Sequence, residues 1–445
     1  MPSLTRLMRP RVGAQVLKDA SGELRRPGAT WRFEPYKYMN ALNALRLSVM
    51  RATQRALNID YAIREVTIPA RELEKKGVKI IKLNIGDPNK WDFETPPHVR
   101  AALCRAVEEC DNGYTQEEGV LELRQALLEK ERKKNNVDAD VDDIFITNGV
   151  SESILNIVAA SVNPGDEVLV PGPSYPSYTE YIKYFGGVPI AYKTDEANGW
   201  QPDLDDIRKK ITAKTKAMVI INPNNPTGAL YSRKVLKGIT DLVGEHEMFI
   251  MSDEIYDLMT FEGEHCSPSV VAPDIPMVLF NGFSKVDLLP GWRLGYSCFR
   301  DPKGELDEIK EGFVKQLRLR LCANHPCQLA VIEALKGPQD YMEVTRCKLR
   351  ERGAFAHKRL NEIEGISSTK PKGAFYIFPK VELKKWKTDK EFVLDVLHET
   401  HVLFVHGSGF DPTYGAGHFR SVFLPPVAVL TEAFDRLDAF MRKNA

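Results

Sequence analysis

The chain has 445 residues, of which 43% are hydrophobic and 27% charged, and its 61 basic residues balance 61 acidic ones to a net charge of zero. This length is typical of a two-domain globular protein, and the balanced charge argues against a nucleic-acid-binding groove. No apolar run approaches the length of a membrane span, so we expect no membrane segment. The seven cysteines lack CxxC spacing, which favours reduced thiols in a cytoplasmic protein and indicates no metal site.

Residues 1–49 differ from the rest of the chain because they combine many Arg and Lys residues with turn-forming Pro and Gly. They lack the apolar core of a secretory signal, and Asp19, Glu23 and Glu34 disfavour an organelle-targeting peptide. Met50 offers an alternative start. We therefore expect an N-terminal extension that is either disordered or not part of the natural product.

From residue 95 the chain alternates between apolar strand patterns and amphipathic helical patterns. Helices are predicted from residue 95 and over residues 121–133 and 154–162. Strand cores are predicted at 144–146, 167–170, 188–191, 218–221, 248–251, 277–280 and 294–298. Strands that are apolar throughout are buried on both faces, so they predict a mostly parallel sheet covered by helices.

After about residue 320 the pattern changes to a mixture typical of an α+β domain. Strands are predicted at 373–378, 402–405 and 418–424, and helices at 389–399 and 430–442.

Four polar motifs follow strand cores, and ligands of open α/β sheets bind at the carboxyl ends of the strands. The first, residues 147–152 (TNGVSE), lies between a strand and a helix. Its backbone N–H groups could cradle a phosphate. Taken alone, its glycine is explained equally well by turn geometry.

The second motif, residues 222–228 (NPNNPTG), forms a rigid turn that fixes the direction of Asn225, whose amide can donate to a phenolate-type oxygen. The third, residues 252–256 (SDEIY), places Asp253 at the end of a buried strand, where a carboxylate must be paired or solvated. A protonated pyridine nitrogen would satisfy it, and a helix N-cap is the alternative. Tyr256 could share the ring oxygen with Asn225.

The fourth motif, residues 281–285 (NGFSK), follows the next strand core. Lys285 at the mouth of a sheet can lose its charge through desolvation and then form an imine with an aldehyde. Arg293, eight residues further on, supplies a cation for a phosphate.

In this order and spacing, the four motifs resemble those of class I/II aminotransferases of fold type I, over residue 50 to the end. The chain is most similar to microbial alanine aminotransferases through LNIGDP at 83–88, PGPSYP at 171–176, SDEIY at 252–256 and HFRSVFLPP at 418–426. The resemblance implies a mostly parallel seven-stranded sheet in a large α/β/α domain at 95–320. It also implies a smaller α+β domain built from residues 50–94 and 321–445.

The resemblance implies pyridoxal 5'-phosphate as the cofactor, with Lys285 as its Schiff-base lysine and proton carrier. The other cofactor contacts that it implies are Asp253 at the pyridine nitrogen, Asn225 and Tyr256 at the ring oxygen, Tyr175 stacked on the ring, and Arg293, Val150, Ser151 and the partner subunit's Tyr114 at the phosphate. For the substrate it implies Arg420 at the α-carboxylate, with Gly86 and Asn225 close by. The resemblance also implies a homodimer.

One position departs from the family pattern, because Gly282 stands where many relatives carry a phosphate-binding Ser or Thr. The activity implied by the resemblance converts L-alanine and 2-oxoglutarate into pyruvate and L-glutamate, and back. Another amino-acid specificity (aspartate, aromatic or branched-chain) and a β-lyase stay open, since Arg420 is common to these enzymes. A catalytically silent cofactor-binding regulator is disfavoured because the extension has no helix-turn-helix pattern, and a Rossmann dehydrogenase because no early strand is followed by GxGxxG.

Overall fold

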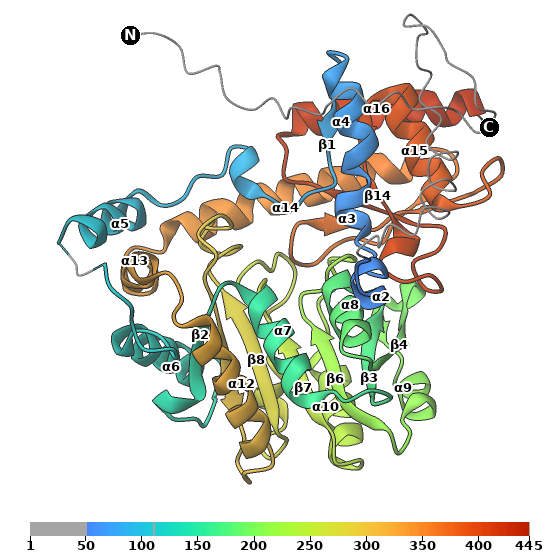
Figure 1. Cartoon of the computed structure of the whole chain (residues 1–445). Coiled ribbons are helices and arrows are strands. Elements are labelled where there is room, and N and C mark those ends of the chain that lie inside the picture. Colours follow the sequence, from blue (N-terminus) through green and yellow to red (C-terminus); the bar gives the residue numbers. More distant parts are fainter. Residues whose placement is uncertain (1–50, 110–111, 445) are drawn as a thin grey trace, which may run out of the picture. The chain divides into compact units, whose positions relative to one another are not determined.

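The central feature of the molecule is a twisted sheet on which the polar motifs are arranged (Figure 1). The structure is a computed structural model that describes residues 51–109 and 112–444. The expectations for residues 1–49 and Met50 lie outside the described residues. Residues Gln54–Ala445 form one compact unit, and the fold is that of this unit.

The sheet has eight strands within the described residues, in the order β2-β9-β8-β7-β6-β3-β4-β5. In that order they span Ile144–Thr147, Gly295–Arg300, Met277–Gly282, Phe249–Asp253, Thr215–Ile221, Glu167–Gly172, Val188–Asp195 and Gln201–Pro202. Strands β8, β7, β6, β3 and β4 pair in parallel, whereas β9 and β5 run antiparallel to their neighbours. The predicted mostly parallel α/β sheet is therefore confirmed.

The predicted strand number of seven is one too low. The additional strand, β5, has two residues and pairs at the edge through Thr194↔Pro202 and Asp195↔Gln201. A strand this short carries no apolar run, so its pattern could not be separated from that of a loop.

Two apolar layers cover the faces of the sheet because side chains alternate along each strand. In β6, Ala217, Val219 and Ile221 join the layer under α7, α8 and α12, whereas Met218 and Ile220 point to the opposite layer. Figure 1 shows α7 and α12 in front of the strands. The α-helices between residues 97 and 336 are α5 (Pro97–Glu109), α6 (Leu121–Asn135), α7 (Val150–Ser161), α8 (Pro176–Tyr184), α9 (Leu204–Lys210), α10 (Arg233–Gly244), α11 (Pro268–Val271), α12 (Asp307–Arg320) and α13 (His325–Lys336).

The rest of the unit combines segments from near both ends of the chain. Strand β1 (Ile81–Lys82) pairs in parallel with β13 (Val402–Leu403), and β15 (Phe419–Val422) lies between β11 (Tyr376–Ile377) and β14 (Val405–His406). Further elements here are α2 (Gln54–Leu57), α3 (Ala62–Glu65), α4 (Thr67–Lys75), α14 (Asp340–Asn361), β10 (Ile366–Ser367), β12 (Lys380–Val381), α15 (Asp389–Thr400) and α16 (Val427–Asn444). The domain limits at residues 94 and 320 stay a prediction.

The strand predicted over 373–378 is shorter than expected. Ala374 adopts a φ of 56°, and its N–H donates to the carbonyl of Met259, while the N–H of Gly373 donates to the carbonyl of Gly228. The backbone of this segment is thus directed toward the turn after β6, and only Tyr376–Ile377 joins the sheet.

The aromatic contact between α12 and the sheet generates a stability prediction. The ring of Phe313 is fully buried and lies 5.7 Å from that of Phe145 and 5.4 Å from that of Phe299, centroid to centroid. We expect Phe313→Ala to lower the free energy of unfolding by about 3–5 kcal/mol in urea denaturation, because it leaves a cavity. The control, Leu319→Ala on the same helix, removes a side chain that is 88% exposed and should cost less than about 0.5 kcal/mol. Equal losses in the two variants would contradict this packing.

Candidate active site

The carboxyl ends of β2, β3, β6, β7 and β8 meet at one edge of the sheet, and a cavity of about 710 Å³ lies there. β9 is antiparallel and begins at the same edge, two residues after Arg293. Ten of the predicted site residues line this cavity. They are Gly86, Val150, Ser151, Tyr175, Asn225, Asp253, Tyr256, Lys285, Arg293 and Arg420.

Lys285 lies in the turn after β8, and its Nζ donates to the carbonyl oxygen of Gly86 at 2.9 Å. The pKa of Lys285 is lowered to about 8, mainly by burial; the carboxylate of Asp87 acts to raise it, whereas the nearby cations of Arg420 and Arg293 act to lower it. The amine is therefore far closer to its neutral, nucleophilic form at physiological pH than an exposed lysine is.

Asp253 ends β7 with its carboxylate buried. Its Oδ2 accepts from the hydroxyl of Tyr178 at 3.0 Å, and its Oδ1 accepts from the N–H of Ile255 at 3.2 Å. Burial raises the pKa of Asp253 to about 6, although both hydrogen bonds act to lower it. Since both partners are neutral, the carboxylate is suited to pair with a cationic ring nitrogen.

The N-terminus of α7 forms a cradle for an anion. The helix begins after Gly149, whose φ is 78°, and no side chain caps it. Nη2 of Arg293 donates to the carbonyl of Asn148 at 3.3 Å, and a Cβ on Gly149 would overlap this guanidinium. The helix N-terminus and the cation therefore converge on one point, the arrangement that binds a phosphate.

The structure explains the glycine at position 282. Gly282 is the register partner of Gly295, and a Cβ on Gly282 would lie 2.8 Å from the Cα of Gly295 and 2.9 Å from the carbonyl oxygen of Leu294. The neighbouring backbone thus leaves no room for a Ser or Thr there. Ser284, one residue before Lys285, lines the cavity.

Arg420 enters the cavity from β15, with its side chain fully buried. Nη1 donates to Oδ1 of Asn225 at 2.9 Å, Nη2 donates to the carbonyl of Asn84 at 2.5 Å, and Nε has no hydrogen-bond partner. The guanidinium carbon lies 4.5 Å from the ring centroid of Tyr376 and 4.8 Å from that of Phe410. A buried guanidinium with an unused donor is a fitting receptor for a carboxylate.

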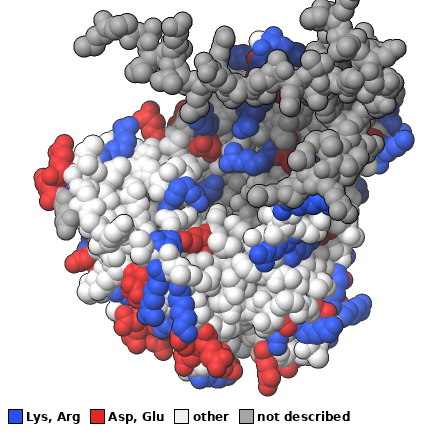
Figure 2. All heavy atoms as spheres, in the orientation of Figure 1, with Lys and Arg blue, Asp and Glu red and all other residues white. Residues whose placement is uncertain are grey.

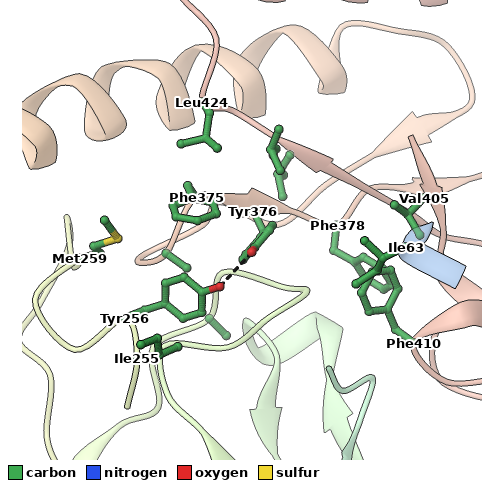
Figure 3. Close-up of a cluster of buried hydrophobic side chains, with 14 of the residues drawn as sticks. Ile63, Ile255, Tyr256, Met259, Phe375, Tyr376, Phe378, Val405, Phe410 and Leu424 are labelled. Carbon is green, nitrogen blue, oxygen red and sulfur yellow. Dashed lines mark hydrogen bonds between the residues drawn. The ribbon is translucent and has the colours of Figure 1, made fainter. Parts of the chain in front are cut away.

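Three tyrosines of the site were not predicted. Tyr178 contacts Asp253, the hydroxyl of Tyr61 donates to that of Tyr175 at 2.9 Å, and the hydroxyls of Tyr256 and Tyr376 lie 2.8 Å apart (Figure 3). Tyr178 lies three residues after Tyr175, in the helix that begins at Pro176, so its closeness in sequence to a predicted site residue was a usable signal. No sequence signal identified Tyr61 or Tyr376, because each contacts a partner more than 100 residues away in the sequence.

Tyr114 does not line the cavity, and its side chain is 82% exposed. Tyr114 is predicted to contact the phosphate in the site of a second subunit, and this role stays a prediction.

The four motifs, the buried lysine and the carboxylate receptor together match one enzyme family. The family model of class I and II aminotransferases covers residues 78–437, and the chain belongs to this family. The glutamate-pyruvate aminotransferase AlaA of Haemophilus influenzae is 40% identical, over 84% of this chain and 93% of that protein. The alanine aminotransferase of Mycobacterium tuberculosis strain H37Rv is 37% identical, over 88% of this chain and 93% of that protein.

Solved structures agree in fold. An alanine aminotransferase from Pyrococcus furiosus is 57% identical with a TM-score of 0.87, and the match covers 88% of this chain and all of that chain. An aspartate aminotransferase from Thermus thermophilus with maleate is 31% identical with a TM-score of 0.81, over 88% of this chain and all of that one.

Figure 2 shows lysine and arginine side chains interspersed with aspartate and glutamate on one face. No helix within residues 51–109 and 112–444 is long and apolar enough to cross a membrane. Over the same part of the chain, no group of three or more His, Cys, Asp and Glu side chains could hold a metal ion.

The environment of Lys285 predicts a pH dependence of its reactivity. We expect arylation of Lys285 by trinitrobenzenesulfonate in cofactor-free protein, followed by peptide mass spectrometry, to rise through a midpoint near pH 8, the pKa of this lysine. Arg420→Met should move the midpoint upward, because it removes a cation that disfavours the charged amine. The control is Arg318→Met, which removes an exposed arginine that pairs with Glu117. An unchanged midpoint in Arg420→Met would contradict the electrostatic coupling.

Proposed function

We propose that this aminotransferase carries pyridoxal 5'-phosphate and interconverts L-alanine and 2-oxoglutarate with pyruvate and L-glutamate. The observation that carries the proposal is the 57% identity to the alanine aminotransferase from Pyrococcus furiosus over the full length of that chain. The relatives named above as alanine or glutamate-pyruvate aminotransferases support the same substrates.

The cavity fits the cofactor at each of its polar groups. The buried carboxylate of Asp253 complements a protonated pyridine nitrogen, and the cradle of Arg293, Val150 and Ser151 complements the phosphate. Asn225 accepts from Arg420 with its Oδ1, which leaves its amide nitrogen to donate to the ring oxygen beside the hydroxyl of Tyr256.

When bound, pyridoxal phosphate supplies an aldehyde that joins amines and a ring that delocalises negative charge. Lys285 holds the cofactor through Nζ. Once released by a substrate amine, Nζ of Lys285 would be the base that accepts the proton of the substrate α-carbon and the acid that returns it. A lysine with a pKa of about 8 suits this role, because it can both accept and return a proton near neutral pH.

Arg420 would fix the substrate by its α-carboxylate, with Asn225 and Gly86 beside it. The fork of a guanidinium binds a carboxylate in one orientation, which holds the α-proton toward Lys285. Tyr175 lines the cavity, its hydroxyl accepts from that of Tyr61, and its ring would stack on the cofactor.

We also propose a homodimer that works in the cytoplasm. The resemblance places Tyr114 in a partner's phosphate site, and its side chain, which is 82% exposed, is accessible for such a contact. The cysteines within the described residues are free thiols, which supports a reducing compartment.

The first prediction of this function is spectroscopic. We expect the purified protein with pyridoxal phosphate to show a visible absorbance band that shifts to the near ultraviolet when L-alanine is added. Lys285→Ala should lose the band, whereas Lys303→Ala, at an exposed lysine, should keep it. A band that ignores L-alanine but responds to L-aspartate would favour the specificity named for the Thermus relative. The absence of any band would contradict the proposal.

The second prediction concerns Arg420. We expect Arg420→Lys to lower kcat/KM for L-alanine by about 10²-fold, because an ammonium cannot reproduce the two-pronged contact of a guanidinium, and a hydrogen bond to a charged group is worth about 1.5–3 kcal/mol. Steady-state kinetics would measure this. Arg442→Lys, at a side chain that is 74% exposed, is the matched control and should not change kcat/KM. A loss of less than about threefold in Arg420→Lys would remove Arg420 from the substrate site.

A further inference from the structure

Tyr376 lies at the junction of the cofactor side and the substrate side of the cavity. It begins β11 and is 3% exposed (Figure 3). Its hydroxyl lies 2.8 Å from that of Tyr256, and its ring face lies 4.5 Å from the guanidinium carbon of Arg420. One side chain thus contacts both a group that serves the cofactor and the group that serves the substrate.

The backbone around Tyr376 allows it little freedom. A Cβ on Gly86 would overlap the Tyr376 hydroxyl, so the glycine is what admits this ring to its position. The neighbouring ring of Phe375 lies 4.7 Å away, and the ring of Tyr256 meets that of Tyr376 edge-on at 5.7 Å and 86°. The hydroxyl is therefore held where it can reach Tyr256.

We propose that Tyr376 is a positioning residue that links Arg420, which binds the substrate carboxylate, to the hydroxyl of Tyr256 that meets the cofactor's ring oxygen. This inference rests on the proposed function. In the isolated pair either hydroxyl can donate. When the hydroxyl of Tyr256 donates a hydrogen bond to a negatively charged oxygen, it can only accept from Tyr376. The hydrogen bond from Tyr376 then makes the hydroxyl of Tyr256 a stronger donor to that oxygen.

The ring of Tyr376 has a second effect, on Arg420. The guanidinium lies between the rings of Tyr376 and Phe410, so its rotation is restricted and its donors stay in the plane in which Asn225 is bound. Loss of the hydroxyl and loss of the ring should therefore have different consequences. The ionisable groups that face Tyr376 are Tyr256, Arg420, Tyr175 and Asp253.

The test compares Tyr376→Phe, which keeps the ring and loses the hydroxyl, with Tyr376→Leu, which loses both. The first readout is the pH at which the visible band of the cofactor-loaded protein changes. We expect Tyr376→Phe to move this midpoint upward by about half a pH unit. A ring oxygen that is less stabilised as an anion interacts more strongly with the proton on the nearby Lys285 nitrogen, so this proton is lost at a higher pH. The matched control is Tyr192→Phe, which removes another buried hydroxyl, bonded to the carbonyl of Val219 at 2.9 Å, and should leave the midpoint unchanged.

The second readout is the affinity for glutarate, an unreactive dicarboxylate, measured by calorimetry on the cofactor-loaded protein. We expect Tyr376→Phe to change the Kd less than about twofold and Tyr376→Leu to raise it about tenfold, because only the latter removes a π face from Arg420. If Tyr376→Leu does not fold, Tyr376→Phe decides alone. An unshifted band midpoint in Tyr376→Phe would overturn the role of Tyr376, whereas the absence of a band in the unsubstituted protein would instead overturn the proposed function.

Discussion

The close approach of backbone to backbone at two glycines is the constraint on which the site depends. Gly282 of β8 faces Gly295 of β9, and a Cβ on Gly295 would lie 2.7 Å from the backbone nitrogen of Val150 at the start of α7. Main-chain contacts therefore fix the distances between three elements. These are the turn that carries Lys285, the strand that follows Arg293 and the N-terminus of α7. Side-chain rotamers contribute little to this frame, which makes it rigid.

Charge is the second constraint. The ionisable groups of Lys285, Asp253 and Arg420 are buried, and the hydrogen bonds that each makes within the chain go to neutral partners. Burial of an ion without an opposite charge is costly, so these positions weaken the isolated chain. The proposed cofactor, with a phosphate and a ring cation, and a substrate carboxylate would supply opposite charges in direct contact with these groups. The cavity is thus unfavourable for the chain alone and complementary to its proposed ligands.

Much of the sheet and most of the site could be predicted because the residues that define them are close together in sequence. Strands such as β6 and β7 are apolar throughout, and each is followed directly by its polar motif, so topology alone brings Asn225, Asp253 and Lys285 together. The resemblance of the C-terminal motif to that of a family added Arg420, which has no local signal of its own.

The parts that were missed depend on contacts distant in sequence. The edge strand β5 exists because it pairs with the end of β4, and β11 is short because Gly373 and Ala374 bind to the turns after β6 and β7 instead. Tyr376 acquires its position from Tyr256, which lies 120 residues earlier. A hydroxyl pair of this kind leaves no pattern in either segment, so only the assembled fold reveals it.

The contact between Arg420 and Asn84 has a consequence for how the protein is made. These residues are 336 positions apart, and β1 and β13 pair across a similar interval. The last strand of the eight-stranded sheet ends at Arg300, so every strand of this sheet is synthesised before Arg420. Long-range contacts of this kind close late and slowly because loop entropy must be overcome first. The proposed carboxylate receptor can therefore form only after the segment that contains Arg420 has been made.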